Sequence, residues 1–130
     1  MNIYNPEHAP NPKEWLALDE DERIRLCEQF HRRIKQKMPN VKVHAIFHSV
    51  AENQIAENLE PVVRAMARLK TDGLSRHDAI HAVASVAAKH FYEVMSGAAE
   101  YDSEMSAQER YNMDIDNLTA TNWYDDDDDE

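Results

Sequence analysis

Apolar residues recur every three or four positions along most of the chain, which is the spacing that places them on one face of a helix. The first such stripe comprises Ile24, Cys27, His31, Ile34 and Met38. It follows Asp19, a suitable N-cap with Glu22 three residues later, and it predicts a helix over 20–37. No long stretch alternates with the two-residue period of a strand. The pattern therefore predicts an all-α protein.

The same spacing, together with start and stop signals, predicts four more helices. We expect them over about 41–57, 60–71, 76–96 and 106–118. Pro61 suits the first turn of the helix at 60–71, and Gly73 suits the position just after its end. Gly97 would end the helix at 76–96 in the same way. These signals fix the expected boundaries.

The two ends of the chain differ in composition from its middle. Residues 1–12 contain three prolines and three asparagines and predict an extended arm, which Tyr4 and Trp15 would anchor on the body. Residues 121–130 finish in six consecutive acids, and we expect a disordered tail there because like charges repel. We therefore predict one helical domain over 1–120, a bundle of about four to five helices, followed by the acidic tail.

Charge and composition limit the partners of this protein. The net charge is −11, and removing the six terminal acids leaves −5. Without a basic patch, we expect neither nucleic-acid binding nor attachment to an anionic membrane. No apolar run is long enough to cross a bilayer, and no secretory segment follows Met1. A single cysteine forms no internal disulfide. We expect a cytoplasmic protein whose partner, if it has one, is another protein or a second copy of the chain.

Two histidine pairs carry the candidate chemistry. His44 and His48 are four residues apart, and so are His77 and His81. Residues at this spacing lie on one face of a helix, so two imidazoles can converge on one metal ion. A single such pair is more often a surface accident or two hydrogen-bonded core histidines. The presence of two pairs favours a metal site.

The expected topology brings the two pairs together. Short connections would make the helices at 41–57, 60–71 and 76–96 run up, down and up, so that the first and third are parallel. Both pairs would then lie in first turns at the same level. Four protonated imidazoles inside a bundle would repel one another, whereas a divalent cation binds neutral imidazole and removes that conflict. We predict that these four histidines bind a transition metal between two parallel helices.

Glu52 lies one helical turn beyond His48 and extends the predicted site. It is a candidate fifth ligand, a partner that orients an imidazole, or a general base for bound water. This donor set favours zinc or iron, with nickel or copper also compatible. An open coordination position would allow metal-assisted hydrolysis. The alternative function is a non-catalytic interaction module, with structural core histidines and with the acidic tail or the arm docking on a basic partner.

Other residues have simpler interpretations. His31 lies on an inward stripe, and Glu28 gives it the Glu-x-x-His spacing of di-iron bundles, but the further glutamates of such sites are missing. Cys27 is interpreted as a small buried hydrophobe. We expect core positions for Phe47, Met66, Phe91 and Met95, and surface positions for His8, His90, Arg64 and Arg68.

The stretch from "WLALDEDER" through "HAIFHSVAENQIAENLEPVVRAMARLKTDGLSRHDAIHAV" resembles a family of small bacterial proteins catalogued only as a domain of unknown function. The likeness covers about residues 15–85. Its specific part is a His-x-x-x-His helix with a nearby Glu and Gln, followed by a second histidine-bearing helix; here these are His44, His48, Glu52, Gln54, His77 and His81. The resemblance implies a bacterial, mostly helical protein in which these positions matter, and it implies no particular reaction.

Overall fold

The computed structural model describes residues 1–35, 38–97 and 105–123, and every regular element in these ranges is a helix. The helices are α1 (Pro12–Ala17), α2 (Glu20–Arg33), α3 (Val41–Ala56), α4 (Glu60–Thr71), α5 (Arg76–Ser96) and α6 (Ala107–Asp116). The all-α prediction is confirmed. None of these helices has both the length and the apolar character that crossing a membrane requires. The end of the predicted acidic tail, residues 124–130, lies outside the described residues.

Most helices begin and end where the sequence signals predict. The Ser75 side chain accepts a hydrogen bond from the Asp78 amide, and Ser106 forms a complete capping box at the start of α6. Asp19 is the N-cap of α2 but makes no side-chain hydrogen bond there, so its predicted capping box is absent. Gly97 ends α5 in the left-handed conformation, with φ of 73°. α2 ends at Arg33 rather than at the predicted residue 37.

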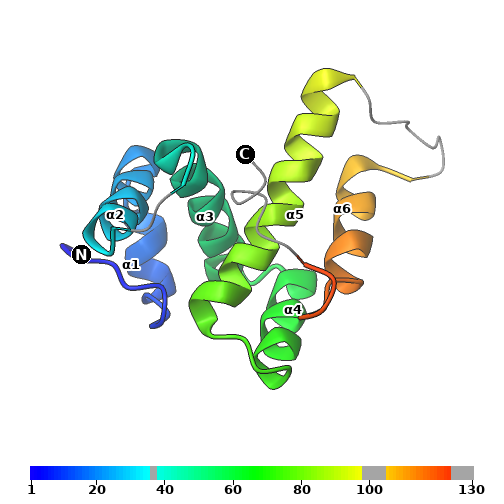
Figure 1. Ribbon diagram of the computed structural model, residues 1–130, viewed down its shortest axis with the longest axis horizontal. Helices are drawn as coiled ribbons and strands as arrows, with labels where there is room; N and C mark the ends of the chain where they lie inside the picture. The colour runs from blue at the N-terminus through cyan, green and yellow to red at the C-terminus, as the bar shows by residue number, and fades with distance from the viewer. Residues whose placement is uncertain (36–37, 98–104, 124–130) are drawn as a thin grey trace.

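Helix α3 lies at the centre of the molecule. Figure 1 shows α1 and α2 on one side of it and α4, α5 and α6 on the other. The smaller apolar cluster includes Tyr4, Trp15, Leu26, Cys27, Phe30 and Ala45 and joins the N-terminal arm, α1 and α2 to α3. Ala51 of α3 belongs instead to the larger cluster, which is built mainly from α4, α5 and α6. The anchors predicted for the arm, Tyr4 and Trp15, are fully buried.

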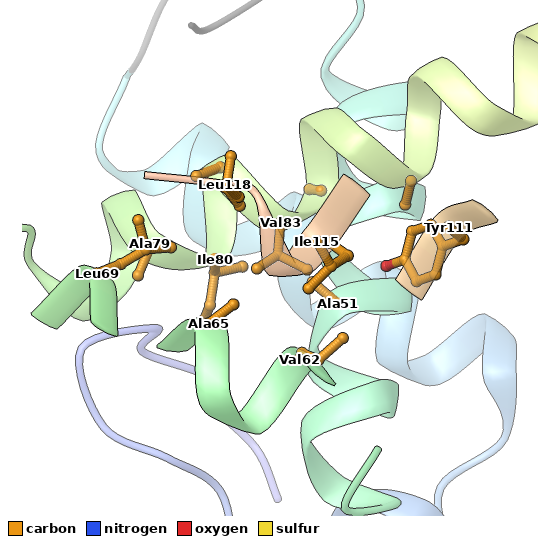
Figure 2. Packing of buried hydrophobic residues seen from close by; sticks show 13 residues of the cluster. Ala51, Val62, Ala65, Leu69, Ala79, Ile80, Val83, Tyr111, Ile115 and Leu118 are labelled. Carbon is orange, nitrogen blue, oxygen red and sulfur yellow. The ribbon is translucent and has the colours of Figure 1, made fainter. Parts of the chain in front are cut away.

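The larger apolar cluster holds the second half of the chain together. Figure 2 shows Ile80 and Val83 of α5 among side chains from α3, α4 and α6, including Ala65 and Ile115. All four side chains have no exposed surface. Such close packing fixes the position of the first half of α5, which carries two of the predicted site histidines.

Some expectations for the core and the surface were wrong. Phe91 and Met95 are 50% and 69% exposed because α5, with 21 residues, extends past the 12-residue α4. His90, expected on the surface, is mostly covered, and its Nε2 lies 2.6 Å from a carboxylate oxygen of Asp114 of α6, within hydrogen-bonding distance. Arg68 is partly buried, and its guanidinium donates to backbone carbonyls near the end of α6. Long-range contacts with α6, which helical spacing does not reveal, account for the last two differences.

Replacing Ile80 with alanine is expected to lower the free energy of unfolding by about 2–5 kcal/mol, because it leaves a cavity in a fully buried position. Urea unfolding followed by circular dichroism measures the change. Val63→Ala on α4 is the control, since Val63 is 38% exposed and its truncation should cost within about 0.5 kcal/mol. Equal losses for the two variants would contradict the assignment of Ile80 to the core.

Candidate metal centre

Five histidine side chains from three helices gather where the two halves of the molecule meet. This five-histidine cluster consists of His31 of α2, His44 and His48 of α3, and His77 and His81 of α5. Two sets of three within it have ligand atoms that all lie within 4.8 Å of one another. The first triad is His31, His48 and His77, and the second triad is His31, His44 and His81. The two triads share His31.

The two predicted pairs do meet, but in a different arrangement from the expected one. His44 lies against His81, with ring centroids 4.2 Å apart, and His48 lies 5.5 Å from His77. The first histidine of α3 therefore lies against the second histidine of α5, and the second histidine of α3 lies near the first histidine of α5. The prediction that these helices run parallel is wrong; they cross, as Figure 1 shows. It assumed that α4 returns alongside α3, whereas α4 packs mainly on α5 and α6.

His31 has one ring nitrogen committed to the backbone and the other directed into the cluster. Its Nδ1 lies 2.7 Å from the carbonyl oxygen of Cys27, which can only accept, so Nδ1 carries the proton. The neutral ring then has its lone pair on Nε2, which lies 3.4 Å from Nε2 of His77. Two nitrogens bound to one tetrahedral zinc at about 2.1 Å are about 3.4 Å apart. This pair of nitrogens thus has the spacing of metal ligands.

His44 and His81 are hydrogen-bonded to each other. Nε2 of His81 lies 2.6 Å from Nε2 of His44, and both side chains are buried. One of these nitrogens must donate and the other accept, because two lone pairs at this distance would repel. The pair is therefore satisfied within the protein. A metal ion in the second triad would have to break this hydrogen bond.

A chain of hydrogen bonds fixes the orientation of His48. Both carboxylate oxygens of Glu52 accept from the Arg76 guanidinium, at 2.6 and 3.0 Å, and one of them also accepts from the Tyr4 hydroxyl. The Tyr4 oxygen lies 2.9 Å from Nε2 of His48. The Tyr4 hydroxyl donates its hydrogen bond to Glu52, so Nε2 of His48 must be the donor in its contact with the Tyr4 oxygen. Within the described part of the chain, Nδ1 of His48 is buried and has no hydrogen-bond partner.

Burial favours the neutral form of three histidines of the cluster, His31, His44 and His48. The pKa of His31 is lowered to about 4: loss of solvation is the main cause, the hydrogen bond to the Cys27 carbonyl opposes it, and the neighbouring His77 adds a smaller lowering. Burial and then His81 lower the pKa of His44 to about 2. Burial also holds the pKa of His48 well below its ordinary value. Neutral imidazole is the form that binds metal.

The four histidines predicted from the sequence all lie in the triads, whereas Glu52 belongs to neither. Glu52 is 1% exposed and its oxygens face Arg76 and Tyr4. The sequence analysis did not assign His31 to the metal site, although its position on an inward stripe was the available signal. The link from Tyr4 to His48 and Glu52 has no local signal, because Tyr4 is 44 and 48 residues away from them in sequence.

A scan against protein-family models gave no match for this chain, and neither did searches of the curated proteins and of the solved structures. The resemblance to a family of unknown function stays a prediction. Any function must therefore be argued from the site itself.

Proposed function

We propose that this protein binds one transition-metal ion in the five-histidine cluster, with zinc or iron as the favoured metals. The observation that carries the proposal is the buried Nδ1 of His48, which bears a lone pair and has no hydrogen-bond partner among the residues that the structure describes. A buried polar atom without a partner is costly, and coordination of a metal ion would remove that cost. Imidazole ligands without a nearby thiolate or a cluster of carboxylates suit zinc or iron better than magnesium or calcium.

One ion per chain is expected because the two triads share a single nitrogen. His31 donates from Nδ1 to the Cys27 carbonyl, which leaves only the lone pair of Nε2 for a metal. A nitrogen lone pair binds one ion, so His31 cannot serve both triads at once. The bond of His31 to a backbone carbonyl is also the usual support for a metal-bound histidine.

The first triad is the favoured position of the ion. It includes His48, whose buried Nδ1 has no hydrogen-bond partner among the described residues, and the pair of nitrogens 3.4 Å apart in His31 and His77. A metal ion in the second triad would break the short hydrogen bond of 2.6 Å between His44 and His81, whereas the contact of 3.4 Å between His31 and His77 in the first triad is longer and weaker. Three histidine ligands with an open fourth position are typical of zinc sites that activate water, so metal-assisted hydrolysis is compatible with this assignment. The ligand or base role predicted for Glu52 stays a prediction, and Glu52 is left out of the proposed ligand set because both its oxygens are hydrogen-bonded.

The purified, untagged protein is expected to contain close to one equivalent of zinc or iron, as measured by elemental mass spectrometry. His31→Gln should lose this metal, because His31 belongs to both triads and an amide is not a usual ligand of these ions. His8→Gln is the matched control, since His8 is exposed and should not affect metal content. Circular dichroism verifies that both variants fold.

The rival interpretation is an interaction module in which the histidines serve only as hydrogen-bonded core residues. It predicts no metal in the parent protein, no uptake of added zinc, iron or nickel, and equal metal content in the two variants. That result would overturn the metal proposal. Metal retained in His31→Gln at the level of the parent would also contradict the assigned site.

A further inference from the structure

The N-terminal arm is part of the wall of the histidine cluster. Tyr4 is 1% exposed, although its neighbour Ile3 is 71% exposed. The Tyr4 ring packs on Trp15 and Phe30, with centroid distances of 5.3 and 6.5 Å. Its hydroxyl oxygen lies 2.9 Å from Nε2 of His48. A residue at the very start of the chain thus reaches a proposed metal ligand.

Further contacts hold the arm in this position. The Arg33 guanidinium donates to the carbonyl of Tyr4 at 3.0 Å, and the Arg76 guanidinium donates to the carbonyl of Pro6 at 2.8 Å. The carboxylate of Glu7 accepts from the backbone amide of His77 at 3.2 Å, at the start of α5. An acidic side chain at a helix N-terminus is also favoured by the helix dipole. The arm therefore contacts two elements that carry histidines of the cluster, α2 and α5, in addition to His48 itself.

The tautomer of His48 depends on the Tyr4 hydroxyl. A neutral histidine ring has one protonated nitrogen, and its two tautomers interconvert readily in water, so only a hydrogen-bond partner holds the ring in one of them. Here the Glu52 carboxylate, which is paired with Arg76, can only accept, so it accepts the hydrogen bond that the Tyr4 hydroxyl donates. The Tyr4 oxygen can then accept from Nε2 of His48, which leaves Nδ1 as the nitrogen with the lone pair. Without Tyr4, this preference would be lost.

We propose that Tyr4 is a positioning residue that holds His48 in the tautomer with its lone pair on Nδ1, so that docking of the N-terminal arm controls the affinity of the metal site. This inference rests on the proposed function for its effect on metal binding. The tautomer itself is a property of the metal-free protein and can be measured separately. Loss of such a supporting hydrogen bond typically lowers metal affinity about 10- to 100-fold.

The first measurement is heteronuclear NMR of the histidine ring nitrogens in metal-free protein. The expected result is a proton on Nε2 of His48 in the parent and a mixture of tautomers in Tyr4→Phe, which keeps the buried ring and removes only the hydroxyl. Tyr92→Phe is the matched control, because Tyr92 is 54% exposed and its ring packs on Phe47 and Phe91 instead. A proton on Nδ1 in the parent, or an unchanged tautomer in Tyr4→Phe, would overturn the proposal.

The second measurement is zinc affinity by competition with a chromophoric chelator. Tyr4→Phe should bind zinc about 10- to 100-fold more weakly than the parent, and Tyr92→Phe should bind it equally well. Equal affinity of Tyr4→Phe and the parent would overturn the proposed control by the arm while leaving the metal site intact. A parent that shows the expected tautomer but binds no zinc would instead contradict the proposed function.

A second variant keeps the test decisive if Tyr4→Phe fails to fold. In Glu52→Gln, the amide oxygen can still accept from Arg76, while its NH₂ group donates to the Tyr4 oxygen. The Tyr4 hydroxyl then donates to Nε2 of His48, and the His48 proton moves to Nδ1. We expect this reversed tautomer together with weaker zinc binding. A proton that stays on Nε2 in Glu52→Gln would contradict the proposed chain of hydrogen bonds.

Discussion

Acidification of the metal-free protein from about pH 7.5 to about pH 4.5 is expected to reduce its stability steeply. In the unfolded chain a histidine protonates near its ordinary pKa of 6.5, whereas burial lowers the folded-state pKa of His31 to about 4 and that of His44 to about 2. Below pH 6.5 the unfolded state therefore binds more protons than the folded state. The stability that these neutral histidines contribute is fully present above pH 6.5 and is lost as the pH falls toward the folded-state values.

The size of this effect follows from the number of buried histidines. Each one contributes a slope of about 1.4 kcal/mol per pH unit while it is protonated only in the unfolded state. His31, His44 and His48 together give about 4 kcal/mol per pH unit at most, against a total stability of about 5–15 kcal/mol for a domain. Urea unfolding at a series of pH values measures the slope.

The control variants for this titration are the same pair that tests metal content. His31→Gln removes one buried imidazole and should reduce the slope by about 1.4 kcal/mol per pH unit. His8→Gln removes an exposed histidine and should leave the profile unchanged. A profile that is flat between about pH 6.5 and about pH 4.5 in metal-free parent protein would contradict the burial of neutral histidines.

Replacing Arg76 with alanine is expected to lower the free energy of unfolding by about 3–5 kcal/mol. Glu52 is 1% exposed, and its side chain would lose both hydrogen bonds from the guanidinium. An unpaired carboxylate at such a buried position is far more costly than the net value of the pair. The carbonyl of Pro6 would lose its donor as well, which weakens docking of the arm. Urea unfolding near neutral pH measures the loss.

Arg64→Ala is the matched control for Arg76→Ala. Arg64 also pairs with a carboxylate, that of Asp116, but the two side chains are 54% and 44% exposed. Solvent screens such a pair, so its loss should cost about 0–1 kcal/mol. In the background of Arg76→Ala, the further change Glu52→Gln should restore part of the lost stability because it removes the unpaired charge. If Arg76→Ala cost no more than Arg64→Ala, the buried pair would not have the structural role assigned to it.

The acid titration, the Arg76→Ala variant and the proposed metal site concern the same group of side chains. Neutral histidines are costly to protonate where they are buried, and they are also ready to bind a metal ion. Protons and metal ions compete for the same nitrogen lone pairs, so the metal affinity of the folded protein should fall as the pH approaches the low folded-state pKa values of these histidines. The ion pair of Glu52 and Arg76 supports the same site through the Tyr4 hydroxyl, which contacts both Glu52 and His48.

The sequence by itself determined the helices and the face of α3 and α5 that carries histidines. Helical periodicity is a local property, and so are caps such as Ser75 and the stop at Gly97; both are encoded within a few residues. The four-residue spacing of His44 and His48 places them on one face in any α-helix. These features were predictable because neighbouring residues alone decide them.

Only the tertiary structure decided which partners meet across helices. His31 completes both triads because α2 packs against α3. Tyr4 contacts His48 because the N-terminal arm packs beside α3, although the two residues are 44 positions apart in sequence. The crossing of α3 and α5, which replaced the predicted parallel arrangement, depends on where α4 finds its apolar contacts. Such contacts reflect side-chain packing between segments far apart in the chain, and no local spacing encodes them.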